Sequence, residues 1–114
     1  MVVDVPAIQK QLRAFAEARD WEQFHTPKNL AMALAVESSE LLELFQWLTP
    51  EQSQHLGDEL PAERVQEELA DILIYLLRLA DVLGVDLDSA VENKLEANAR
   101  KYPIAEVRGS ARKR

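Results

Sequence analysis

The sequence contains no cysteine among its 114 residues. Disulfide bonds, thiolate metal sites and cysteine nucleophiles are therefore excluded. The same absence is typical of proteins that work in the reducing cytoplasm, which is where we expect this chain to act. Glycine is also scarce, with three residues. None of them belongs to the glycine-rich loop with which many nucleotide-binding proteins hold phosphate.

Long hydrophobic runs and an excess of positive charge are missing as well. The apolar run Ile72–Leu77 is far shorter than the roughly 20 residues that a membrane-spanning helix needs. The stretch 1–14 lacks the order of a signal peptide, in which positive charges precede apolar residues. The formal net charge is −7, whereas a phosphate backbone is bound by positive surfaces. We therefore expect no membrane partner and no nucleic-acid duplex as a partner.

What the sequence does contain is helical periodicity. Hydrophobic residues make up 47% of the chain, enough for one small domain with a core. No stretch alternates between apolar and polar residues as a strand does, so the predicted class is all-α, a four-to-five-helix bundle. The expected helices cover about 6–19, 27–48, 61–84 and 87–102. They form one domain over residues 1–103, followed by a basic, mobile tail over residues 104–114.

Capping residues support these helix limits. Asp4, Thr26 and Asp86 each precede an expected helix and have the side-chain oxygen that caps a first turn. Proline follows closely after Asp4 and Thr26, where the first turn of a helix tolerates it best. Gly84 is typical of the position just past a helix end.

The third expected helix has a run that is apolar on every side of the cylinder. Residues Ile72–Leu77 leave no polar face to meet solvent, and such a helix has to be covered all round. Three partner helices in one small subunit cannot cover it completely. We therefore predict a homo-oligomer in which a second subunit packs against this helix, as a tetramer or a dimer.

Two pairs of carboxylates are the feature that indicates chemistry. Glu37 and Glu40 are three apart on the second expected helix, and Glu68 and Asp71 are three apart on the third, so each pair projects to one side. Only Glu68 has a cation, Arg64, one helical turn away. Two carboxylates about 4 Å apart repel by roughly 4 kcal/mol at an effective dielectric near 20. Antiparallel packing of the helices would bring the two pairs together.

Protonation or a bound cation would relieve this repulsion. Oxygen donors without cysteine or histidine nearby favour Mg²⁺, with Mn²⁺ as a second possibility. The competing interpretation is that these acids lie on solvated helix faces, which is the usual place of glutamate. The chain would then be a non-catalytic helical module whose acidic surface binds a basic partner protein.

The carboxylate pattern also resembles a known family. Glu37-x-x-Glu40 followed by Glu68-x-x-Asp71 is similar to the signature of the MazG-type, all-α nucleoside triphosphate pyrophosphohydrolases. Further stretches resemble the dCTP pyrophosphatase branch of that family, namely 15–25, Glu40-Leu-Leu-Glu-Leu-Phe-Gln-Trp47, 67–75, Lys94-Leu-Glu-Ala-Asn98 and Arg100-Lys-Tyr-Pro103. The resemblance covers residues 12–103.

The resemblance implies an enzyme that hydrolyses a nucleoside triphosphate between its α and β phosphates, with Mg²⁺ as cofactor. The expected substrate is dCTP or a modified relative, and the expected role is house-cleaning of the nucleotide pool. The four carboxylates Glu37, Glu40, Glu68 and Asp71 would be the metal ligands and catalytic residues. We prefer Glu37 or Glu40 as the general base.

The same resemblance implies a set of substrate-binding residues. Trp21 and Trp47 would stack on the base, and His25 would read its edge, because stacking needs only a flat aromatic face. Lys94 and Asn98, together with Lys101, are expected at the triphosphate, and Tyr75 is expected to offer its hydroxyl to the substrate. The stretch 52–59 does not match the dCTP branch clearly, so dUTP or a broad range of triphosphates stays open as the alternative substrate.

Overall fold

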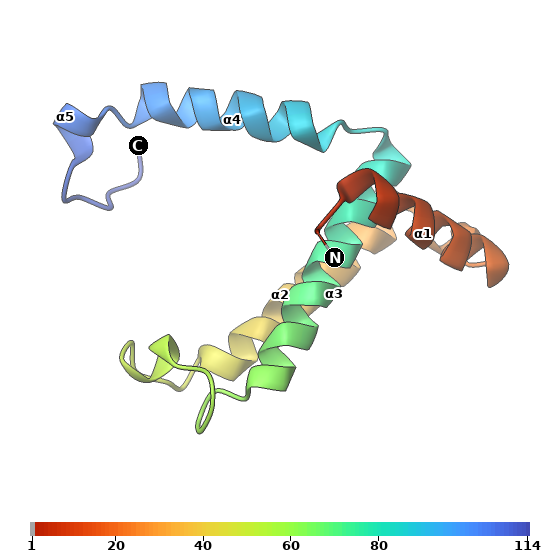
Figure 1. Ribbon diagram of the computed structural model, residues 1–114, viewed down its shortest axis with the longest axis horizontal. Coiled ribbons are helices and arrows are strands. Elements are labelled where there is room, and N and C mark those ends of the chain that lie inside the picture. The colour runs from red at the N-terminus through yellow and green to blue at the C-terminus, as the bar shows by residue number, and fades with distance from the viewer. Residues whose placement is uncertain (1) are drawn as a thin grey trace. The chain divides into compact units, whose positions relative to one another are not determined.

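The computed structural model describes residues 2–114. Within them the regular elements are all helical, so the predicted all-α class is confirmed (Figure 1). The α-helices are α1 (Val5–Ala18), α2 (Pro27–Phe45), α3 (Ala62–Leu83), α4 (Leu87–Lys101) and α5 (Ile104–Val107). Two single turns of 3₁₀-helix, η1 (Glu22–Phe24) and η2 (Gln52–Gln54), lie in the connections on either side of α2.

The helix starts follow the capping residues predicted from the sequence. The side chains of Asp4, Thr26 and Asp86 accept hydrogen bonds from the backbone N–H three residues further on, at 3.1, 3.2 and 3.2 Å. Each bond satisfies a backbone donor that has no partner inside the first turn. Gly84 follows α3 with a φ of 70°, a conformation that glycine adopts without strain.

Some limits differ from the prediction. α2 ends at Phe45 rather than at residue 48, because the backbone N–H of Leu48 donates to the carbonyl of Phe45 at 2.9 Å and closes a tighter turn. The connection between α2 and α3 contains η2, and the expected tail contains α5. The backbone N–H of Arg114 donates to the hydroxyl of Tyr102 at 3.0 Å.

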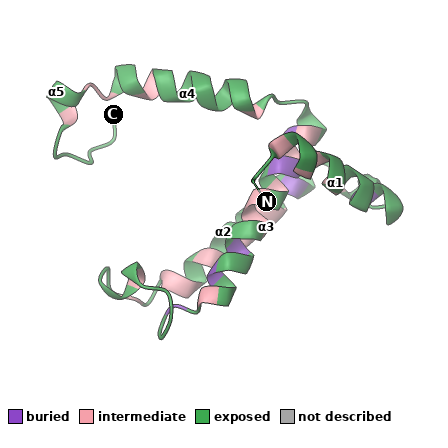
Figure 2. Ribbon diagram, viewed as in Figure 1, coloured by how far each residue is buried: buried purple, intermediate pink, exposed green. Residues whose placement is uncertain are grey.

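The chain divides into two compact units, one up to Leu83 and one from Gly84 onward. In the first unit, α2 and α3 lie side by side and run in opposite directions, and α1 packs on α3 (Figure 1). The buried residues of this unit lie mostly on α3, where Figure 2 colours the ribbon purple. The apolar ones are Ala16, Leu30, Leu60, Val65, Leu77 and Ala80.

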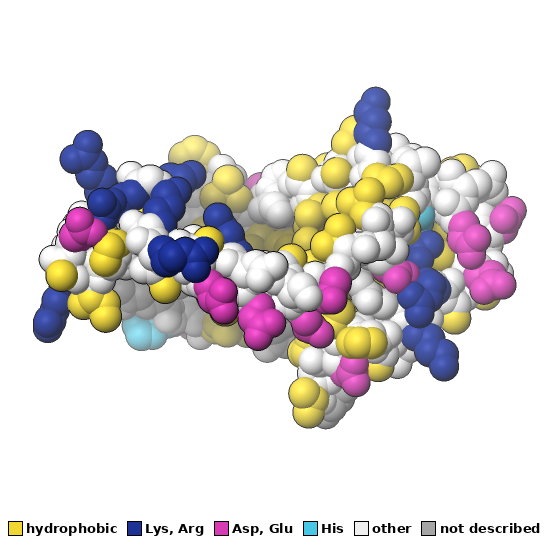
Figure 3. Space-filling view, turned by 90° about the horizontal axis from the view of Figure 1, so that it is seen from above, with side chains coloured by type: hydrophobic (Ala, Val, Ile, Leu, Met, Phe, Trp, Pro, Cys, Tyr) yellow, Lys and Arg dark blue, Asp and Glu magenta, His cyan; other side chains and the backbone are white. Residues whose placement is uncertain are grey.

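Many large hydrophobic side chains stay on the surface. On α3, Leu69, Ile74, Leu76 and Leu83 are between 39% and 54% exposed. Figure 3 shows hydrophobic side chains in yellow over the part of the chain that holds α1 and α3. Exposed apolar area of this kind is consistent with a covering subunit, and the oligomer stays a prediction. None of the helices in residues 2–114 is long and apolar enough to cross a membrane.

The second unit consists of α4, α5 and the residues that follow them. Its basic end was predicted from the sequence, and Figure 3 shows lysine and arginine side chains in dark blue at the end that carries α5. In this unit the guanidinium of Arg114 lies 3.5 Å from the carboxylate of Glu106. An exposed ion pair of this kind contributes little to stability.

Candidate functional site

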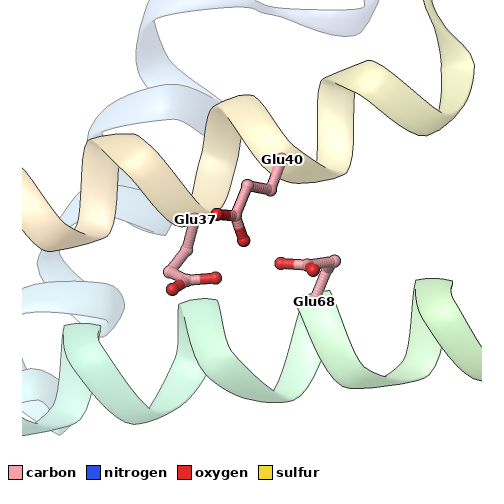
Figure 4. Close-up of side chains that lie close together, drawn as sticks. All are labelled: Glu37, Glu40 and Glu68. Carbon is pink, nitrogen blue, oxygen red and sulfur yellow. The ribbon is translucent and has the colours of Figure 1, made fainter.

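The antiparallel packing of α2 and α3 brings three of the predicted carboxylates together. One oxygen from each of Glu37, Glu40 and Glu68 lies within 4.8 Å of the other two. Figure 4 shows Glu37 and Glu40 extending from α2 toward Glu68 on α3. Glu68 is only 7% exposed, and the two residues of α2 are half-buried. We call these three residues the carboxylate cluster.

Sequence spacing explains why the cluster forms here. The two glutamates of α2 are less than one turn apart and share the side of the helix that carries the buried Leu30. On α3, Glu68 follows the buried Val65 by three residues, and its carboxylate meets those of α2. The apolar contacts between the two helices therefore determine the separation of the carboxylates.

The cluster is electrostatically uncompensated. The Oε2 atoms of Glu37 and Glu68 are buried and have no hydrogen-bond partner. The ion pairs formed by residues 2–114 do not involve any of the three carboxylates. Burial raises the pKa of Glu37 to about 7, and the nearby carboxyl groups of Glu68, Glu40 and Asp71 raise it further.

A divalent cation would satisfy this arrangement. Buried carboxylate oxygens without a partner are the donors that Mg²⁺ and Mn²⁺ prefer, and the group contains no nitrogen or sulfur ligand. Three carboxylates are also fewer ligands than the six of an octahedral ion, which leaves coordination positions for water or a phosphate oxygen. The residues present therefore fit a hard divalent metal.

Asp71, the fourth predicted ligand, lies one turn further along α3. It is not one of the three residues whose oxygens lie within 4.8 Å of one another. It is close enough for its charge to contribute to the raised pKa of Glu37. Its side chain forms part of the wall of a neighbouring cleft.

This cleft has a volume of about 330 Å³ and mostly apolar walls. Three of the predicted substrate-binding residues, Trp21, His25 and Tyr75, line it together with Asp71. The indole of Trp21 contacts its neighbours edge to face, with ring centroids 5.7 Å from Phe15 and 6.3 Å from His25. Asp71 lies in the wall of this cleft and one helical turn from Glu68 of the carboxylate cluster. The cleft can therefore hold a flat ring beside a metal-bound group.

Other lining residues were not predicted from the sequence. Leu12, Phe15, Ile74 and Arg78 complete the walls. Arg78 is 8% exposed, and its Nε donates a hydrogen bond to Nδ1 of His25 at 3.1 Å. A signal for Arg78 did exist, since it is a single cation directly after the apolar run of the third helix.

The remaining predicted residues follow α2 or belong to the second unit. Trp47 follows the end of α2, is 87% exposed and does not line the cleft. Lys94, Asn98 and Lys101 lie on α4 in the second unit. Asn98 is half-buried and the two lysines are exposed, with the ammonium of Lys101 5.7 Å from the ring of Tyr102.

Comparison with known proteins shows which family and which relatives this chain is similar to. The model of the MazG-like family matches residues 32–113. The chain is 52% identical over 99 residues to dCTP pyrophosphatase 1 of Bos taurus, covering 85% of this chain and 58% of that protein. It is also 52% identical over 101 residues to dCTP pyrophosphatase 1 of Homo sapiens, covering 87% of this chain and 59% of that protein. The chain thus spans less than two thirds of the length of these relatives.

A solved structure extends the similarity to the fold. The crystal structure of a pyrophosphatase from Archaeoglobus fulgidus DSM 4304 superposes with a TM-score of 0.79 at 44% sequence identity. The alignment covers 86% of this chain and 91% of the archaeal one.

Proposed function

The chain belongs to the MazG-like family, and we propose that it is a Mg²⁺-dependent pyrophosphohydrolase of dCTP or of modified dCTP. The products would be the nucleoside monophosphate and pyrophosphate. The observation that carries the proposal is the carboxylate cluster, with its partnerless buried oxygens next to an aromatic cleft of about 330 Å³. The names of the relatives, dCTP pyrophosphatase and pyrophosphatase, support the same reaction.

In this proposal Glu37, Glu40 and Glu68 hold the metal, and Asp71 is the fourth ligand. When bound, the cation neutralises phosphate oxygens and lowers the pKa of water for attack at the α phosphorus. Glu37 or Glu40 is our choice for the residue that accepts the proton of that water. Both face the point where the carboxylates converge (Figure 4).

The aromatic cleft is the proposed site of the base. Trp21 supplies a flat ring for stacking, which is worth roughly 1 to 3 kcal/mol per base. His25 is the residue that we assign to the base edge, and Tyr75, one helical turn from Asp71 on α3, lines the same cleft and would offer its hydroxyl to the substrate. Trp47 is the second proposed stacking residue.

The triphosphate needs positive or hydrogen-bonding groups in addition to the metal. Lys94 and Asn98 are four apart on α4 and project to the same side of that helix. We propose that these two side chains, with Lys101, bind the phosphates. Arg100 stays a less favoured candidate, because a cation in the last turn already interacts favourably with the helix dipole.

The exposed apolar side chains support a homo-oligomer, a tetramer or a dimer, as the assembled enzyme. A soluble nucleotide pool as substrate is consistent with a cytoplasmic location.

A panel of triphosphates tests the proposal directly. The protein is incubated with Mg²⁺ and dCTP, 5-methyl-dCTP, dUTP, dTTP or dATP, and the products are separated by chromatography. Monophosphate plus pyrophosphate from dCTP is the expected result, and diphosphate plus phosphate would contradict it. Preferred turnover of dUTP, or equal turnover of all five, would favour the alternative substrate range. Glu68→Gln is the inactive control, and absence of turnover with every substrate would refute the enzymatic assignment.

A further inference from the structure

Arg78 is the buried cation of the first unit, and its partners are unusual. Its side chain is 9% exposed, although a buried guanidinium is costly unless all of its donors are used. Its Nη1 lies 3.6 Å from Asp81, less than one turn further along α3. Its Nε reaches across to a residue 53 positions away in the sequence and donates to Nδ1 of His25 at 3.1 Å.

This hydrogen bond determines the protonation of the imidazole. A guanidinium has only donors, so the nitrogen that it faces has to be an acceptor. Nδ1 of His25 is therefore unprotonated, and the proton of the neutral ring is on Nε2. Burial and the charge of Arg78 both lower the pKa of His25, in the same direction.

His25 lines two cavities. One is the aromatic cleft, which it lines with Trp21, Asp71 and Tyr75. The other is a wider charged groove, whose other ionisable residues are Lys10, Arg13, Glu17, Glu22, Arg78 and Asp81. Because Nδ1 is already bonded to Arg78, the N–H at Nε2 is the donor that the ring has left for a ligand.

A second ion pair belongs to the same network. Nη1 of Arg13 on α1 lies 2.6 Å from Oδ1 of Asp81, and the other oxygen of Asp81 faces Arg78. Asp81 thus connects the two arginines, and the chain of contacts runs from α1 through α3 to the wall of the cleft. Arg13 is at the solvent end of this chain, with a side chain that is 52% exposed.

We propose that Arg78 is a positioning residue that fixes His25 as a neutral Nε2–H donor toward an acceptor atom on the edge of a pyrimidine base in the cleft. The part about the base rests on the proposed function, whereas the fixed tautomer does not. A fixed donor would favour a base whose facing edge presents a ring nitrogen or carbonyl acceptor, because an unmatched buried donor is costly. Although Arg78 also lines the cleft, its proposed role is exerted through His25.

The tautomer is tested by NMR on the full chain without any substrate. His25 and His55 are the two histidines of the sequence, so His55→Gln leaves a single imidazole to observe in ¹⁵N-labelled protein. The expected spectrum at pH 7 shows a protonated Nε2 and an unprotonated Nδ1. A protonated Nδ1, or an imidazolium at that pH, would overturn the proposal, whatever the enzyme turns over.

Kinetics test the action of Arg78 through His25. Arg78→Met removes the donor and keeps an unbranched side chain, and the loss of one hydrogen bond predicts a KM for dCTP raised roughly fivefold with kcat nearly unchanged. In a His25→Ala background the same substitution should have no further effect on KM. An equal rise of KM in that background would show a purely structural role and refute the proposal.

Arg13→Met is the matched control, because it removes a guanidinium from the same network without touching His25. Its KM should stay within about twofold of the wild type, since Asp81 still pairs with Arg78. A KM as high as that of Arg78→Met would contradict the specific role of Arg78. If Arg78→Met does not fold, the imidazole spectrum of the His55→Gln protein decides the question.

Discussion

Removing one charge from the carboxylate cluster should change the stability of the protein in opposite directions without and with a bound metal. Glu37→Gln replaces a charged carboxyl by a neutral amide of the same shape. The oxygens lie within 4.8 Å of one another, and at that largest separation two negative charges repel by about 3.5 kcal/mol at an effective dielectric of 20. Water at these half-buried side chains reduces the effect. We expect the substitution to stabilise the metal-free protein by about 1 to 2 kcal/mol at pH 8.

The pH dependence follows from the raised pKa of Glu37, which is about 7. The folded protein favours the protonated carboxyl, so the stability that this proton contributes is complete below the ordinary value of 4.5. It is lost as the pH rises through about 7. Glutamine resembles the protonated form at every pH. The advantage of Glu37→Gln should therefore be small at pH 4.5 and largest at pH 8.

Thermal unfolding in EDTA and in Mg²⁺ measures both effects. For a chain of 114 residues, 1 kcal/mol corresponds to a shift in Tm of about 4 °C. Without metal at pH 8, Glu37→Gln should therefore melt about 4 to 8 °C above the wild type. With Mg²⁺ at a hundred times its Kd, the wild type gains about 2.7 kcal/mol, whereas the variant gains little. In Mg²⁺ the melting temperature of the wild type should then equal or exceed that of Glu37→Gln.

Glu43→Gln is the matched control, because Glu43 is an exposed glutamate on the same helix. It should leave the melting temperature and its response to Mg²⁺ nearly unchanged, with ionic strength matched by a monovalent salt. If Glu37→Gln behaved like Glu43→Gln without metal, the carboxylates would not repel as the structure indicates. A wild type that responds equally to Mg²⁺ and to the monovalent salt would refute the metal site.

Further substitutions test the other parts of the site. Asp71→Ala should abolish turnover of dCTP while circular dichroism shows unchanged helix content, and retained activity would remove Asp71 from the ligand set. Trp21→Ala should raise the KM for dCTP roughly tenfold through the loss of stacking, and an unchanged KM would exclude Trp21 from the base site. Gly84→Ala should lower Tm by about 4 °C, since alanine at a φ of 70° costs about 1 kcal/mol. An unchanged Tm would show that the turn relaxes. Analytical ultracentrifugation should give a mass above that of a single 12.9 kDa chain, and a helical monomer at all concentrations would refute the covering subunit.

Local chemistry explains how well the helices were predicted. The caps at Asp4, Thr26 and Asp86 and the glycine after α3 act within a few residues, so their effects can be predicted from the sequence. The end of α2 was predicted three residues too late, because the tighter turn at Phe45 has no strong signal in the sequence. The family, too, was predicted correctly from short motifs.

In the site, too, the features that depend on local spacing were predictable, whereas those that depend on contacts between helices were not. Spacing of three residues places Glu37 beside Glu40, and Glu68 beside Asp71, on any α-helix, so the sequence by itself determined the two acidic pairs. It also determined the helices that carry them, because caps and periodicity are local. Only the tertiary structure decided that Glu68, rather than Asp71, joins the two glutamates of α2 within 4.8 Å. Only the tertiary structure brought Arg78 to His25, 53 residues away. The physical reason is that contacts between helices depend on which apolar side chains interlock, and no spacing within one helix specifies that register.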